Sequence, residues 1–149
     1  MISVDVNILV RYAVKDEPQQ TIIATDFLAK HSCFVLKTVL LELIWVLGSS
    51  SGYALSRELV LKRVKHILGL PNVVMQDADH VAFALDWYEA GMDFADALHL
   101  ASSSELTAFA TFFWFPNSVW ESMKGRSASR DAEHRNRHSQ PEVGNEKMF

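Results

Sequence analysis

The chain has 149 residues, 49% of them hydrophobic and 21% charged, which is enough apolar content for one compact domain with a core and excludes a disordered chain. Only 6 Gly and 4 Pro occur, so the chain is not collagen-like, and its single cysteine, Cys33, excludes a disulfide scaffold and suits a reducing compartment. The net charge is −4, and residues 1–115 carry 8 Lys or Arg against 13 Asp or Glu. This balance argues against a broad basic groove for nucleic acid and is compatible with an acidic, metal-binding pocket.

Hydrophobic periodicity predicts that short strands and helices alternate along the first part of the chain. Residues 2–6 alternate as in a buried strand, and residues 7–14 follow as a first helix. Pro18 begins a second helix, and residues 33–36 form a second strand. Thr38 then caps a third helix. The residues that we expect this helix to bury are Leu40, Leu41, Ile44, Trp45 and Leu47.

The same alternation continues toward residue 115. Ser56 precedes a helix that stops at Gly69, and its expected apolar face holds Leu59, Val60, Val64, Ile67 and Leu68. Residues 72–75 form a third strand, and Asp77 caps a helix that ends at Gly91. A further helix runs from about residue 94 to residue 104. Residues 106–115 begin as a strand and become a cluster of aromatic side chains.

Strands separated by helices indicate an α/β fold with a mainly parallel central sheet. Apolar periodicity is lost after Trp120, so we predict a domain over residues 1–115 and an atypical, flexible tail over residues 116–149. No apolar stretch approaches the ~20 residues that span a bilayer. Asp5 also interrupts the apolar start of the chain, so we expect neither a membrane helix nor a signal peptide, and place the protein in the cytoplasm.

Four acidic residues occupy positions where chemistry is expected. Asp5 lies at the end of the first strand, and the carboxyl ends of parallel strands face a ligand crevice, although Asp5 could equally cap the next helix. Glu42 is the one charged residue in an apolar helix, where it either binds a cation or occupies the wet face. Asp93 and Asp96 share one helical face, and they either bind a ligand or stabilise the start of that helix.

The donor types point to a hard cation. Carboxylate oxygens without a neighbouring Cys or His cluster suit Mg²⁺ or Mn²⁺ better than zinc. Such a pocket fits metal-assisted cleavage of a phosphodiester, in which the metal activates water, stabilises the developing charge and orients the substrate. A phosphatase of the haloacid dehalogenase type is an alternative. It would have a second Asp where this chain has Asn7, and its Thr and Lys motifs are not apparent.

Three segments together resemble the PIN domain and, more narrowly, the VapC-type ribonuclease toxins of bacterial toxin–antitoxin pairs. The segments are Met-Ile-Ser-Val-Asp5-Val-Asn7-Ile-Leu-Val-Arg-Tyr, Val-Leu-Leu-Glu42-Leu-Ile-Trp-Val-Leu and Asp93-Phe-Ala-Asp96-Ala-Leu-His-Leu-Ala, and the match covers residues 1 to about 112. The resemblance implies a three-layer α/β/α sandwich around a parallel sheet. It also implies an endoribonuclease that depends on a divalent metal, Mg²⁺ or alternatively Mn²⁺, and cleaves RNA.

The resemblance also assigns roles to single residues. Asp5, Glu42 and Asp96 match the catalytic, metal-ligating acids of the family, and Asp93 matches an acidic position that accompanies them. Asn7 matches the polar residue that supports the site by hydrogen bonding. The family further implies homodimers and a small cognate antitoxin that covers the active site.

Arg11 lies one helical turn beyond Asn7 and could approach a substrate phosphate, with an exposed surface arginine as the alternative interpretation.

The sequence departs from these toxins near residue 113. Their last helix is usually followed by a strand ending in Thr-x-Asp, which supplies a fourth acid, whereas this chain has Thr111-Phe112-Phe113. The closing helix and final strand of the family are also not found, and we hypothesise that residues from about 113 onward come from a shifted reading frame. We expect weakened metal binding and reduced or absent nuclease activity with a largely retained fold. A catalytically inactive PIN-like module that binds antitoxin is the alternative function.

Overall fold

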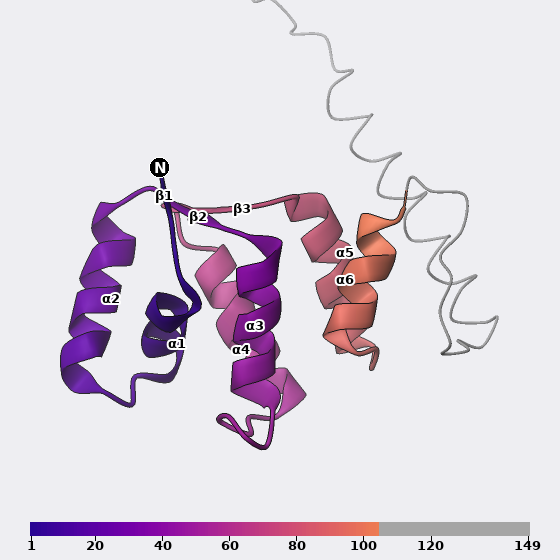
Figure 1. The fold of residues 1–149 in the computed structure, drawn as a ribbon, viewed down its shortest axis with the longest axis horizontal. Helices are drawn as coiled ribbons and strands as arrows, with labels where there is room; N and C mark the ends of the chain where they lie inside the picture. The colour runs from indigo at the N-terminus through magenta and orange to yellow at the C-terminus, as the bar shows by residue number, and fades with distance from the viewer. Residues whose placement is uncertain (105–149) are drawn as a thin grey trace, which may run out of the picture. The chain divides into compact units, whose positions relative to one another are not determined.

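The computed structural model describes residues 1–104, which form three short strands and six helices (Figure 1). The strands are β1 (Ile2–Ser3), β2 (Cys33–Val35) and β3 (Val73–Met75). The helices are α1 (Val6–Val14), α2 (Pro18–Lys30), α3 (Lys37–Gly48), α4 (Arg57–Leu68), α5 (Ala78–Glu89) and α6 (Phe94–Ser102). No helix within residues 1–104 is both long and apolar enough to cross a membrane.

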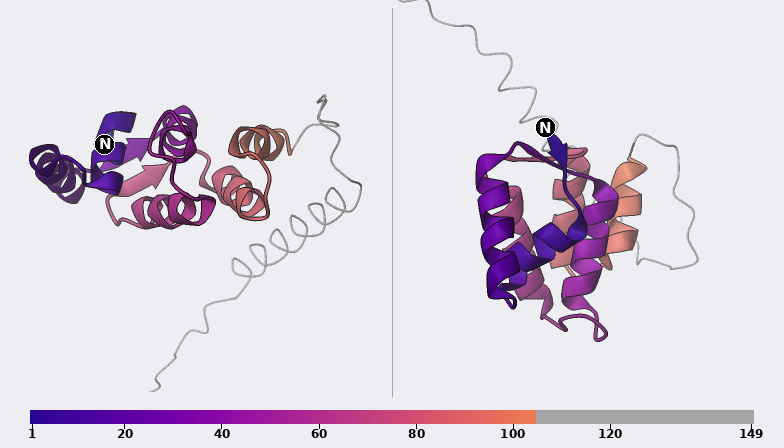
Figure 2. Two further views of the ribbon diagram at one scale, coloured as in Figure 1. Left: turned by 90° about the horizontal axis from the view of Figure 1, so that it is seen from below. Right: turned by 60° about the vertical axis from the view of Figure 1, so that its left-hand side comes forward.

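The strands form one parallel sheet in the order β1-β2-β3, with Ile2 opposite Cys33 and Val35 opposite Met75. A pair of helices connects each strand to the next, as a parallel sheet requires. The left-hand view of Figure 2 shows the sheet between α1 and α3 on one face and α4 on the other. The predicted α/β fold with a parallel sheet is therefore confirmed. The predicted final strand, the domain boundary at residue 115 and the tail over residues 116–149 lie outside the described residues.

The core lies between the sheet and the helices. Helix α3 shows how the sequence builds it, because its buried residues are spaced at i, i+3, i+4 and i+7, which places them on one face. These residues are Leu40, Leu43, Ile44 and Leu47, each at most 5% exposed. Cys33 and Val35 of β2 are fully buried in the same cluster. No polar or charged residue among residues 1–104 is buried, so the core of this part is purely apolar.

Most predicted helix starts are confirmed, and two predicted caps are wrong. The Ser56 hydroxyl caps α4 by accepting a bond from the Leu59 backbone N–H. Helix α3, however, begins at Lys37, so that Thr38 lies inside it. Asp77 precedes α5 in a left-handed conformation (φ 48°), and its side chain makes no capping bond. Its carboxylate instead pairs with the Lys37 ammonium at 2.7 Å, which lowers the pKa of Asp77.

Two apolar residues that were expected to be buried lie at the surface. Trp45 on α3 is 61% exposed and Leu59 on α4 is 44% exposed, whereas Leu43 and Leu61 are buried. Both helices carry apolar residues on more than one face, so the position of the core decides which of them are covered.

Candidate functional site

Asp5 lies just beyond β1 and directly before α1, where it has extended backbone angles (φ −85°, ψ 157°). Its Oδ2 accepts hydrogen bonds from the Asn7 side-chain amide at 2.7 Å and from the Asn7 backbone N–H at 3.4 Å. The side-chain bond is the main reason that the pKa of Asp5 is lowered. Asp5 therefore caps α1 and remains an exposed, readily ionised carboxylate, so that the two interpretations of this residue are compatible.

Asp93 and Asp96 lie together at the start of α6. Asp93 is the N-cap, and its Oδ1 accepts bonds from the backbone N–H groups of Ala95 at 2.8 Å and Asp96 at 3.3 Å. Both bonds use Oδ1, so Asp93 Oδ2 has no hydrogen-bond partner within residues 1–104. Asp96 follows in the first helical turn and is half-buried. Both carboxylates therefore lie at the positive end of the helix dipole.

Glu42 is exposed on α3, which contacts both α1 and α6 (Figure 1). Helices α3 and α6 run antiparallel. At the start of α3, Lys37 Nζ donates to Ser102 Oγ at the end of α6 at 3.2 Å. Near the end of α3, Trp45 lines the same pocket as Asp93, which precedes α6. This register sets Glu42 at about the level of the first turn of α6. The helix that carries Glu42 thus lies between the helices that Asp5 and Asp93 begin.

The four acidic residues do not form a finished metal site in this part of the chain. Within residues 1–104, no group of three or more His, Cys, Asp or Glu side chains is placed so that it could hold a metal ion. The donor chemistry itself fits a hard cation, since the candidates are carboxylates and none is buried. Their roles as metal ligands therefore stay predictions, and the fourth acidic position, occupied by Phe113, lies outside the described residues.

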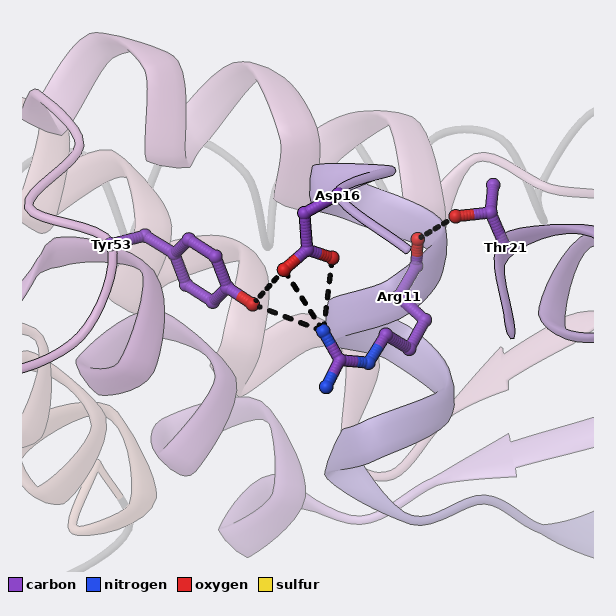
Figure 3. Close-up of polar contacts among 4 residues, drawn as sticks. All are labelled: Arg11, Asp16, Thr21 and Tyr53. Carbon is purple, nitrogen blue, oxygen red and sulfur yellow. Dashed lines mark hydrogen bonds and ion pairs between the residues drawn. The ribbon is translucent and has the colours of Figure 1, made fainter. Parts of the chain in front are cut away.

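Arg11 belongs to a three-residue contact at the end of α1 (Figure 3). Its Nη1 bonds both carboxylate oxygens of Asp16, at 3.0 and 2.9 Å, and lies 3.3 Å from the Tyr53 hydroxyl. Tyr53 donates to Asp16 at 2.7 Å, and this bond, followed by the Arg11 bond, lowers the pKa of Asp16. The contact ties the α1–α2 turn to the loop before α4. Contact of Arg11 with a substrate phosphate stays a prediction.

Arg57 lies beside the candidate site and is not among the residues predicted from the sequence. Its guanidinium lies over the Tyr88 ring, 4.2 Å from the centroid, and its Nη1 donates to the carbonyls of Tyr88 and of Met92, the latter at 2.6 Å. These bonds fix the turn that ends at Asp93, and both Arg57 and Asp93 line a pocket of about 420 Å³. The sequence carries one signal for this residue. Arg57 is a cation in the first turn of a helix, where it opposes the helix dipole, and this unfavourable position indicates a contact elsewhere in the fold.

These observations define a parallel α/β domain with acidic residues beyond its first strand, on α3 and at the start of α6. The family model for the PIN domain matches residues 2–112, roughly three quarters of the chain, and the chain belongs to this family. PIN domains are generally nucleases that use divalent metal ions, and membership of the family suggests an RNA substrate. No curated protein and no solved structure matches the chain.

Replacing Asn7 by Ala is expected to raise the pKa of Asp5 toward its ordinary value, because the side-chain bond that favours the carboxylate is lost. The bond contributes stability above the ordinary pKa of Asp, and that contribution disappears as the pH falls through the lowered pKa. An NMR titration of the Asp5 carboxyl carbon measures the change. Asn72→Ala is the control, because Asn72 donates to backbone carbonyls and not to a carboxylate. An unchanged titration of Asp5 in Asn7→Ala contradicts the assignment.

Proposed function

We propose that this chain is a divalent-metal-dependent endoribonuclease of the VapC toxin type. The observation that carries the proposal is the PIN domain match over residues 2–112, a range that includes Asp5, Glu42, Asp93 and Asp96 in the order and spacing of the motifs. The parallel sheet and the caps formed by Asp5 and Asp93 support it, because they fix these two acids at element ends.

The acidic residues divide the work in this proposal. Asp5, Glu42, Asp93 and Asp96 would hold Mg²⁺ or Mn²⁺, which would supply an activated water and stabilise charge on the scissile phosphate. Asn7 keeps Asp5 ionised and fixes its Oδ2. Asp93 caps α6 and thereby sets the first turn, from which Asp96 projects. Because no three of these groups lie together in the part of the chain described, we expect their carboxylates to converge only with an ion bound.

The same proposal includes partners and a compartment. We infer that the substrate is RNA, that a small cognate antitoxin protein neutralises the enzyme, and that the protein is a cytoplasmic homodimer. The RNA substrate, the antitoxin and the homodimer follow from the VapC-type motifs, and the cytoplasmic location follows from the single cysteine, Cys33, which suits a reducing compartment.

A catalytically inactive PIN-like module that binds antitoxin is the second candidate. Two observations favour it: Phe113 stands where the family supplies a fourth acid, and residues 1–104 alone contain no group of three metal-binding side chains. An inactive module would capture the small antitoxin and leave RNA intact.

A cleavage assay separates the two candidates. The full chain is incubated with a single-stranded RNA carrying a fluorophore and a quencher, with Mg²⁺ or Mn²⁺ added after removal of all metal. The enzyme is expected to cleave only with added metal, and excess EDTA is expected to abolish the signal. Cleavage that persists in EDTA contradicts a metal-dependent enzyme. Capture of the antitoxin without cleavage in either metal supports the inactive module.

A further inference from the structure

A groove of about 570 Å³ lies between the end of α1 and one face of α4. From α4 it is lined by residues spaced at i, i+3, i+4 and i+7, which project from the same side of the helix. The main lining residues are Tyr12, Lys15, Leu59, Lys62, Arg63 and His66. Lys15 ends α1 in a left-handed conformation (φ 60°). We call this feature the α1–α4 groove.

The groove collects three of the four basic side chains that have no acidic partner within residues 1–104, and the fourth, Arg57, lies over the Tyr88 ring. Arg11, Lys30, Lys37 and Lys65 each form an ion pair within residues 1–104. Lys15, Lys62 and Arg63 form none there, and all three line the α1–α4 groove, which has no acidic lining residue. Although residues 1–115 are acidic overall, this surface is locally basic.

Arg63 contributes a guanidinium with one unsatisfied donor to the lining of the groove. Its Nη1 is shielded from solvent and has no hydrogen-bond partner in the described part of the chain. A shielded donor without a partner is less favourable than one that is satisfied. Arg63 lines the groove, and a phosphate is the acceptor that a guanidinium matches best.

The groove also offers flat surfaces beside its cations. The Tyr12 and His66 rings are nearly parallel (3° between planes), and the Tyr12 hydroxyl lies 3.0 Å from His66 Nε2. Lys15 Nζ lies 6.0 Å from the Tyr12 ring centroid. Leu59 adds exposed apolar surface. Cations that can pair with phosphates next to rings on which bases can stack are the features with which proteins bind single-stranded nucleic acid.

We propose that the α1–α4 groove binds the phosphate backbone of single-stranded RNA. The proposal rests on the proposed nuclease function, and it adds a contact away from the acidic residues, because Tyr12 lies about 10 Å along the α1 axis from Asp5. An acidic protein segment is the competing ligand. RNA is favoured because it supplies both phosphates for the cations that line the groove and planar bases for Tyr12, and because the chain belongs to a nuclease family.

The test compares two double variants of the full chain with the same loss of charge. Lys15→Gln with Lys62→Gln removes the two exposed cations of the groove, and Lys30→Gln with Lys65→Gln removes two ion-paired lysines elsewhere. Binding of a fluorescein-labelled oligouridine RNA is followed by anisotropy in EDTA over a range of salt concentrations. The groove variant is expected to bind about tenfold more weakly at low salt, with the slope of log K on log salt reduced by about two. The control is expected to bind like the parent, and thermal unfolding verifies both folds.

A labelled polyglutamate peptide serves as the probe for the competing acidic ligand. Three outcomes would overturn the inference: parental RNA affinity in the groove variant, an equal loss of RNA affinity in both variants, or a groove variant that loses affinity for polyglutamate and not for RNA. The binding assay does not depend on cleavage, so the two proposals fail separately. If RNA binding depends on the groove but the chain does not cleave RNA, the groove proposal stands and the nuclease proposal fails. If the chain cleaves RNA but its RNA affinity does not depend on Lys15 and Lys62, the nuclease proposal stands and the groove proposal fails.

Discussion

Asp5→Asn is expected to lower metal-dependent RNA cleavage by about 100-fold or more, because it removes a full negative charge from the proposed ion site. Asn retains a side-chain oxygen that can accept the bonds from Asn7 and cap α1, so the fold is expected to survive. Initial rates with the fluorophore–quencher RNA measure the loss. Thermal unfolding of the same samples shows whether the variant is folded.

Asp26→Asn is the matched control, since it makes the same chemical change at an exposed position on α2, where Asp26 pairs with Lys30. An exposed ion pair of this kind contributes little to stability, and we expect parental cleavage. If Asp5→Asn cleaves as fast as Asp26→Asn, Asp5 has no catalytic role. An inactive parent with intact antitoxin binding instead supports the second candidate function.

Phe94→Ala is expected to lower the free energy of unfolding by about 3–4 kcal/mol. Phe94 is 2% exposed, and its ring lies edge-on to Tyr88 with centroids 5.8 Å apart. It is also the first residue of α6, directly between the capping residue Asp93 and the turn that carries Asp96. The cavity left by the ring therefore weakens the core and loosens the start of α6 together. Urea unfolding of the variant and the parent gives the difference.

Trp45→Ala provides the comparison, because it also deletes a large aromatic ring but at a position that is 61% exposed. We expect a loss below about 1 kcal/mol for this variant. Phe94→Leu is expected to fall between the two, since much of the buried volume is kept. Equal losses for Phe94→Ala and Trp45→Ala would show that Phe94 is not a core residue.

The order of strands and helices could be predicted from the sequence because local signals agreed with the final packing. Pro18 begins α2 and Ser56 caps α4 as predicted. The start of α3 was predicted wrongly because its cap is not local. The Lys37 backbone N–H is bonded by Gln76 Oε1 at 3.0 Å, from a residue far along the chain, so α3 can begin before Thr38. Trp45 was misplaced because α3 is apolar on several faces.

Less of the candidate site could be predicted than of the fold. The positions of Asp5 and Asp93 followed from element starts, and the capping bonds confirm those positions. The bonds that hold Arg11 could not be predicted, because they depend on Tyr53 meeting Asp16 across the fold. The α1–α4 groove could not be predicted for a similar reason. The net charge of the sequence sums over all residues, and only the fold shows which charged side chains share one surface.

The pairing of the strands has a consequence for how the chain reaches its structure. Ile2 pairs with Cys33 and Cys33 pairs with Val73, so each contact in the described sheet joins segments about thirty or forty residues apart. Such a sheet cannot zip up from a hairpin, and loop closure must precede any gain from pairing. The helices are therefore the natural nuclei of folding, with the sheet completed late in the transition.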